Sequence, residues 1–150
     1  MSSGSALAVA MSVLAGLAGS VQIAVMSKLG DRIGVPAALA WALLLSLGLA
    51  LATLLASTRS LHGLAVAAHQ PVWLWSGAVM GTFIVLTITF AGSRIGTAAT
   101  VAILIAGQLA MGAVIDQFGL FGLDRIPIGP ARAVGIVLLA VGAGLSLTRA

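Results

Sequence analysis

Five stretches of about twenty apolar residues dominate this 150-residue sequence. They cover approximately residues 6–26, 37–56, 72–91, 97–117 and 131–148. A helix needs about twenty residues to cross roughly 30 Å of hydrocarbon. Helices satisfy their own backbone hydrogen bonds in lipid, and the sequence lacks the alternating pattern of a barrel strand. The sequence therefore predicts an all-α integral membrane protein, with five transmembrane helices in a single transmembrane domain over residues 1–150.

The composition excludes other classes of protein. Hydrophobic residues make up 61% of the chain and charged residues 7%, more apolar than a soluble core requires. The absence of cysteine excludes disulfides and thiolate metal sites. His62 and His69 fall in one loop and are interpreted as surface groups. The cations are scattered singly, which favours topology signals over a nucleic-acid patch. No enzyme activity, cofactor, metal or nucleic-acid partner is expected.

Residues near the span ends indicate how the helices begin and stop. Trp73 and Trp75 open the third span, where tryptophan is a natural interfacial anchor. The N-terminus lacks the positive region of a cleaved signal peptide, so we expect the first span to be retained. Glycines often follow helix ends, and five are expected to do so here: Gly30, Gly34, Gly92, Gly96 and Gly119.

The positive charges of the loops nearly balance across the membrane. With five spans, the N-terminal side carries three cations: Arg59, Arg125 and Arg132. The opposite side carries four: Lys28, Arg32, Arg94 and Arg149. Insertion normally keeps the Lys/Arg-rich side in the cytoplasm, so this near tie gives no firm orientation. We therefore expect both orientations to occur, and two oppositely oriented copies to pair as an antiparallel homodimer in the lipid bilayer.

Small residues recur at every fourth position of the first span. The series comprises Ala8, Ser12, Gly16, Ser20 and Ala24, and the third span repeats the pattern at Gly77 and Gly81. Small side chains let transmembrane helices approach closely. We therefore assign helix packing to Ser12, Gly16, Ser20, Gly77 and Gly81.

Polar residues gather in the fourth span. At 100° per residue, Thr97 and Gln108 lie within about 20° of one another, with Thr100 and Asp116 to either side. Gln108 lies near the middle of the span, where its amide must be paired by protein, water or substrate. It is interpreted either as a substrate-binding residue or as a structural hydrogen bond between helices.

Three further residues complete the predicted site. Gln22, near the end of the first span, points away from the small-residue series and is a second candidate for substrate binding. Trp41 is interpreted either as a cavity wall or as an interfacial anchor. Asp116, the one acid within a predicted span, is either a site for a coupling ion or proton or a structural residue near the span end. The predicted substrate-binding set is Gln108, Gln22, Trp41, Thr97 and Thr100.

The sequence resembles the small YdcZ-type family of the drug/metabolite transporter superfamily. The similarity rests on Ala106-Gly107-Gln108 followed by Asp116, on the run 95–100, and on the third-span residues Trp73, Trp75, Gly77, Gly81 and Phe83. It extends from about residue 16 to 144. Met26 stands where the family usually has asparagine. The resemblance implies an inner-membrane exporter, occurring as dual-topology homodimers, gene pairs or fusions.

The leading functional hypothesis is secondary transport of a small organic solute. Two antiparallel copies would supply ten helices related by an in-plane two-fold axis, the inverted-repeat plan of many transporters that work by alternating access. Two alternatives stay open: a dual-topology channel, and an accessory membrane subunit that transports nothing. A channel would show rings of polar residues along its path, and the spans carry few.

Overall fold

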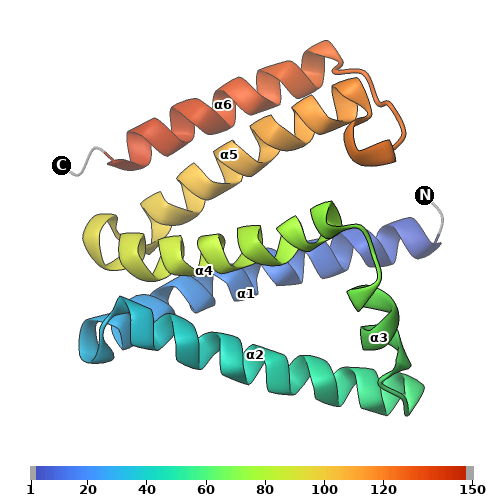
Figure 1. Ribbon diagram of the computed structural model, residues 1–150. Helices are drawn as coiled ribbons and strands as arrows, with labels where there is room; N and C mark the ends of the chain where they lie inside the picture. Colours follow the sequence, from blue (N-terminus) through green and yellow to red (C-terminus); the bar gives the residue numbers. More distant parts are fainter. Residues whose placement is uncertain (1–2, 148–150) are drawn as a thin grey trace. The chain divides into compact units, whose positions relative to one another are not determined.

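The computed structural model describes residues 3–147 and contains helices but no strand within that range (Figure 1). The elements are α1 (Ser3–Ile33), α2 (Val35–Thr58), α3 (His62–Ala68), η1 (Val72–Trp75), α4 (Ser76–Ile95), α5 (Thr97–Phe118), η2 (Leu120–Gly122) and α6 (Pro130–Leu147). Five helical segments are long and apolar enough to cross a membrane: α1, α2, η1 with α4, α5, and α6. The prediction of five membrane-spanning helices is confirmed. Thr148, the last residue of the predicted fifth span, lies outside the described residues, as does Arg149, one of the cations counted in the loops.

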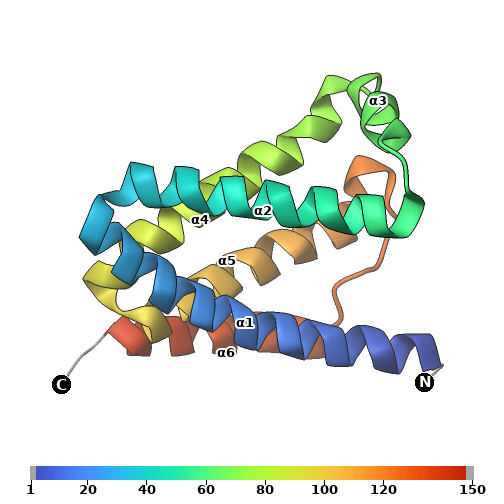
Figure 2. The ribbon, with the colours of Figure 1, turned by 90° about the horizontal axis from the view of Figure 1, so that it is seen from below.

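The chain divides into two compact units. One unit is Val25–Ala91, and the other is made of the described residues before and after that segment. The second of these units contains α5 and α6, which run side by side in opposite directions (Figures 1 and 2). Ala113 of α5 and Ala143 of α6 are buried, as expected where small side chains allow transmembrane helices to pack.

Within Val25–Ala91, the last part of α1 contacts the last part of α4. The Ser27 hydroxyl donates a hydrogen bond to the carbonyl oxygen of Ile88 at 3.4 Å. A Cβ placed on Gly30 would lie 2.8 Å from the Thr89 Cγ2 atom, so only glycine fits. Ser27, Gly30, Ile88 and Thr89 are all buried. Gly30 and Gly92 were expected to follow helix ends, and this is wrong because both lie inside helices, at buried positions.

Two sharp corners join helices through a single glycine. Gly34 separates α1 from α2 with φ 86° and ψ 146°, and Gly96 separates α4 from α5 with φ 83° and ψ 159°. The residues leading into the corners match, Gly-Asp-Arg-Ile-Gly at 30–34 and Gly-Ser-Arg-Ile-Gly at 92–96. In both corners the glycine carbonyl accepts a bond from the amide four residues on, at 3.0 Å from Ala38 and 3.1 Å from Thr100. The chain therefore builds the same corner twice.

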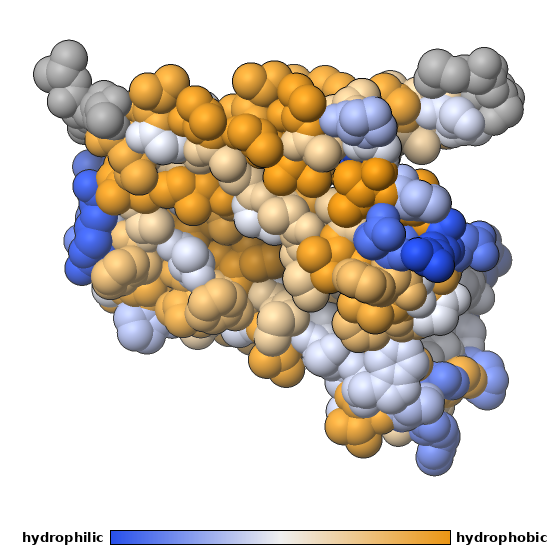
Figure 3. Space-filling view, turned by 90° about the horizontal axis from the view of Figure 1, so that it is seen from above, coloured by the Kyte–Doolittle hydropathy of each residue, from blue (hydrophilic) through white to orange (hydrophobic). Residues whose placement is uncertain are grey.

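Large apolar side chains are exposed along all five long helices. Figure 3 shows one face of the molecule on which apolar residues cover most of the visible surface. A soluble domain would not expose so much apolar surface, whereas a lipid-facing helix must. The distribution of side chains therefore supports the membrane assignment independently of helix length.

Candidate functional site

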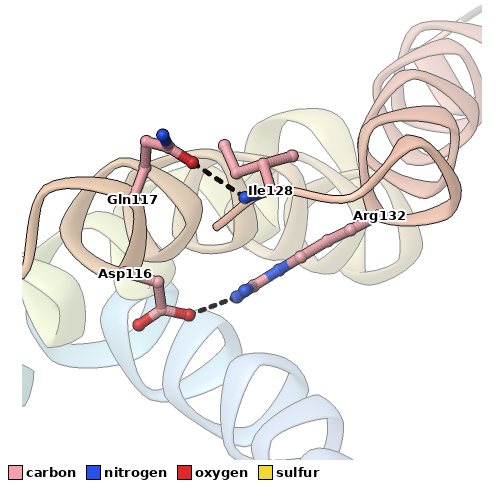
Figure 4. A network of polar contacts seen from close by, with 4 residues as sticks. All are labelled: Asp116, Gln117, Ile128 and Arg132. Atoms are coloured by element: carbon pink, nitrogen blue, oxygen red, sulfur yellow. Dashed lines mark hydrogen bonds and ion pairs between the residues drawn. The ribbon is translucent and has the colours of Figure 1, made fainter. Parts of the chain in front are cut away.

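Asp116 lies in the last turn of α5 and forms an ion pair with Arg132, in the first turn of α6 (Figure 4). The two side chains are 27% and 34% exposed, respectively. The pair connects two antiparallel helices, and its two residues are sixteen positions apart in sequence. The carboxylate that the sequence offered as an ion or proton site therefore has a cationic partner within its own chain. That role for Asp116 stays a prediction, and Arg132 would compete with any other cation.

The loop after α5 satisfies the carbonyl groups that a helix leaves open at its C-terminus. Gly119, in the left-handed conformation with φ 61°, donates its amide to the carbonyl of Ile115. The Ile126 amide donates to the carbonyl of Asp116 at 2.8 Å, and the Arg125 Nε donates to that of Gln117 at 2.9 Å. Three consecutive carbonyls are thus paired. Such pairing matters near lipid, where water is scarce.

Gln117 reinforces the same connection and was missed by the sequence analysis. Its Oε1 atom accepts a hydrogen bond at 2.8 Å from the amide of Ile128, eleven residues later (Figure 4). The partner is a backbone group in an irregular loop, so no sequence periodicity could have indicated it. The signal that could have identified Gln117 is its position as a polar residue at the end of a span. This bond adds to the Asp116–Arg132 ion pair and to the bonds from Ile126 and Arg125 in holding the α5–α6 connection.

Gln22 and Gln108 have no such partners. Both side chains are exposed, Gln22 on α1 and Gln108 on α5. Across residues 3–147, no hydrogen bond of either amide side chain is found. An unpaired amide at membrane depth is costly, so each needs a partner that the described residues of its own unit do not supply. A second copy, water or a solute could supply it.

The other predicted substrate-binding residues lie in different surroundings. Thr100 is buried, and its hydroxyl donates to the carbonyl of Gly96 at 2.8 Å, which occupies its one donor. Thr97 is half-buried at the start of α5. Trp41 lies on α2, in the Val25–Ala91 unit, and is 55% exposed. Their roles in binding stay predictions.

The small-residue series has no partner helix at its centre. Nothing lies within 4 Å of a Cβ built on Gly16, Gly77 or Gly81. The hydroxyls of Ser12 and Ser20 donate back to their own helix, to the carbonyls of Ala8 and Gly16. Within the described residues of its own unit, none of these three glycines has a helix packed closely against it.

The comparisons with known proteins give one match. Residues 7–145 match the model of a family described as "Putative inner membrane exporter, YdcZ". The chain belongs to this family. The match covers nearly the whole chain and confirms the predicted family. Searches of curated proteins and of solved structures gave no significant match.

Membership of the YdcZ family agrees with the features of the molecule. The five long apolar helices fit a multi-pass protein of the inner membrane, in contact with the lipid bilayer. The family is one of exporters, so the chain is a transport protein rather than an enzyme.

Proposed function

We propose that the chain exports a small organic solute by alternating access, as an antiparallel, dual-topology homodimer. The carrying observation is the pair of unpaired amides, Gln22 and Gln108, on helices of membrane length. A single five-helix chain leaves these polar groups exposed, together with the open face at Gly16. A second copy would cover such surfaces.

The near tie of loop charges supports the antiparallel arrangement. Three cations on one side and four on the other allow insertion both ways up. Two inverted copies place equivalent residues about an in-plane axis, and transporters of this plan bind solute near the midplane. Gln108, Gln22 and Thr97 would donate and accept hydrogen bonds there, with Trp41 as a wall and Thr100 shaping the start of α5. Asp116 would hold the coupling ion or proton when Arg132 releases it.

The test is to lock each orientation. His62→Lys, Gly63→Lys and His69→Lys together raise the cation count on the N-terminal side from three to six, at exposed positions. Two lysines appended to the C-terminus raise the opposite side from four to six. With distinct affinity tags, the two locked forms should copurify when coexpressed, and each alone should give neither dimer nor transport. A transport-competent form that works alone would contradict the proposal.

A cysteine reports the orientation directly, because the chain has none of its own. Gly129→Cys lies in the loop before α6, where nothing is within 4 Å of an added Cβ. In the otherwise unaltered chain this cysteine should react with membrane-impermeant reagents from both sides, and in each locked form from one side. Reaction from one side in the unlocked chain would rule out dual topology.

A further inference from the structure

The charged residues within 3–147 lie near the ends of helices or in loops. The sequence has three acids and no glutamate. Asp31 is in the last turn of α1, Asp116 in the last turn of α5, and Asp124 in the loop before α6. The described cations lie likewise within two turns of a helix end or in a loop: Lys28, Arg32, Arg59, Arg94, Arg125 and Arg132. The central turns of the five long helices therefore carry no formal charge within residues 3–147.

The one acid of α5 is already neutralised. Asp116 pairs with Arg132, so the two together contribute no net charge. A solute at mid-membrane would meet amides and hydroxyls, which are neutral donors and acceptors. Gln22 and Gln108 supply both kinds of group and have no partner of their own in the described chain.

Electrostatics decides which solutes such a site can hold. An ion moved from water into a low-dielectric interior loses its hydration, and only an opposite charge or several strong hydrogen bonds compensate for the loss. The four amides of a dimer, two from each copy, can replace the hydration of a polar, uncharged molecule. They supply no opposite charge for a permanent cation in the same position.

The entrances add a bias against cations. On the N-terminal side three cations face two acids, and on the other side four face one, with Arg149 outside the described residues. In an antiparallel pair each membrane face receives both sets. Both entrances are then positive, and a positive field lowers the local concentration of cations.

We propose that the solute is uncharged, with hydrogen-bond donors and acceptors, and that permanent cations are rejected. This rests on the proposed function and names its substrate class. Gln108 is the residue that sets the charge preference, because it lies near the middle of α5 and presents a neutral amide where a carboxylate would attract cations.

The experiment tests whether a glutamate at position 108 changes the preference of the site from uncharged solutes to cations. Purified full-length protein in detergent is dialysed to equilibrium against radiolabelled tetraphenylphosphonium at pH 9, which favours the ionised form of an introduced glutamate. Micelles without protein provide the background. Wild type should show no saturable binding. Gln108→Glu should bind the cation saturably, with a signal at least about ten-fold above the wild-type background, because it supplies the missing counter-charge, whereas Gln108→Leu should match wild type.

Gln22→Glu serves as a second conversion if Gln108→Glu does not fold. Saturable binding of the cation by wild type and by Gln108→Leu would overturn the proposal, because the site would then hold cations without a carboxylate. Two folded glutamate variants that gain nothing would overturn it as well, since the amides would not line the site. The dialysis measures only the binding of the cation by the protein in detergent, and therefore tests only the charge preference. Failure of the dual-topology proposal would appear separately, in the labelling of Gly129→Cys.

Discussion

The two halves of α1 carry the same kind of residue on the same face, in opposite surroundings. At 100° per residue, Ser27 lies within about 20° of Gly16 around the helix. In the C-terminal half this face is buried, and Gly30 is so close to Thr89 that no Cβ fits. In the N-terminal half Gly16 has open space around it. Small residues thus predict a packing face, but they do not say which partner covers it.

The contrast has a functional meaning. One stretch of the face is used within the chain, where Ser27 and Gly30 contact α4. The continuation of the same face is uncovered within its own unit, and the dimer proposal assigns it to the second copy. Substitutions along one helix can therefore separate the stability of the chain from the assembly of the dimer.

The largest effect is expected from Gly30→Leu. The new side chain would overlap the Thr89 Cγ2 atom, which lies 2.8 Å from the position of a Cβ, and Thr89 itself is fully buried. Overpacking of a tight contact costs about 1–3 kcal/mol and sometimes more. We expect a marked loss of thermal stability in detergent and a low yield of folded protein, measured by size exclusion and thermal unfolding.

Gly19→Leu is the matched control, because it places the same side chain in the other half of α1 with nothing within 4 Å of its Cβ. It should unfold at a temperature close to that of wild type. Equal stability of Gly30→Leu and Gly19→Leu would mean that the contact with α4 is loose and that the two halves do not differ.

The same contrast shows how much of the structure could be predicted from the sequence. Span length and hydropathy were sufficient for the five helices, because lipid imposes both directly. The Gly107-Gln108 to Asp116 block, with the third-span pattern, was sufficient for the family. Gly30 was misplaced because a glycine that ends a helix and one that permits close packing look alike in a sequence. Only the neighbouring Thr89 distinguishes them.

The site was less accessible to prediction than the fold. Asp116 was singled out, but its partner Arg132 was assigned only a topological role, since an ion pair between helices depends on how the loop folds. The amides Gln22 and Gln108 were recognised by their polarity. Their function depends on groups outside the single chain, which no pattern in its sequence describes.

A medium effect is expected from Gly34→Ala, at the corner where the C-terminal half of α1 ends. With φ 86° and ψ 146°, Gly34 adopts a conformation that is essentially restricted to glycine and costs other residues about 1–3 kcal/mol. Gly96→Ala, in the matching corner, should lower the unfolding temperature by a similar amount. Thermal unfolding of both variants measures whether an added side chain destabilises the two corners equally.

Gly19→Ala provides the internal standard for this pair, because it sits in an ordinary helical turn with open space around it. Alanine is favoured over glycine in a helix by about 1 kcal/mol at most, so this variant should be as stable as wild type or slightly more so. A corner variant that behaves like Gly19→Ala would show that its corner tolerates a side chain.

The smallest effect on the chain itself is expected from Gly16→Leu, which should act on the dimer instead. Leucine meets nothing at this position within the chain and is a better helix former than glycine, so thermal stability of the monomer should hold. If the open face packs against a second copy, the larger side chain would force the two helices apart. The fraction of dimer in detergent, measured by crosslinking and size exclusion, should then fall well below that of wild type, and Leu14→Ala should leave it nearly unchanged. A Gly16→Leu protein that dimerises normally would show that this half of the face meets lipid, and the second copy would have to pack elsewhere.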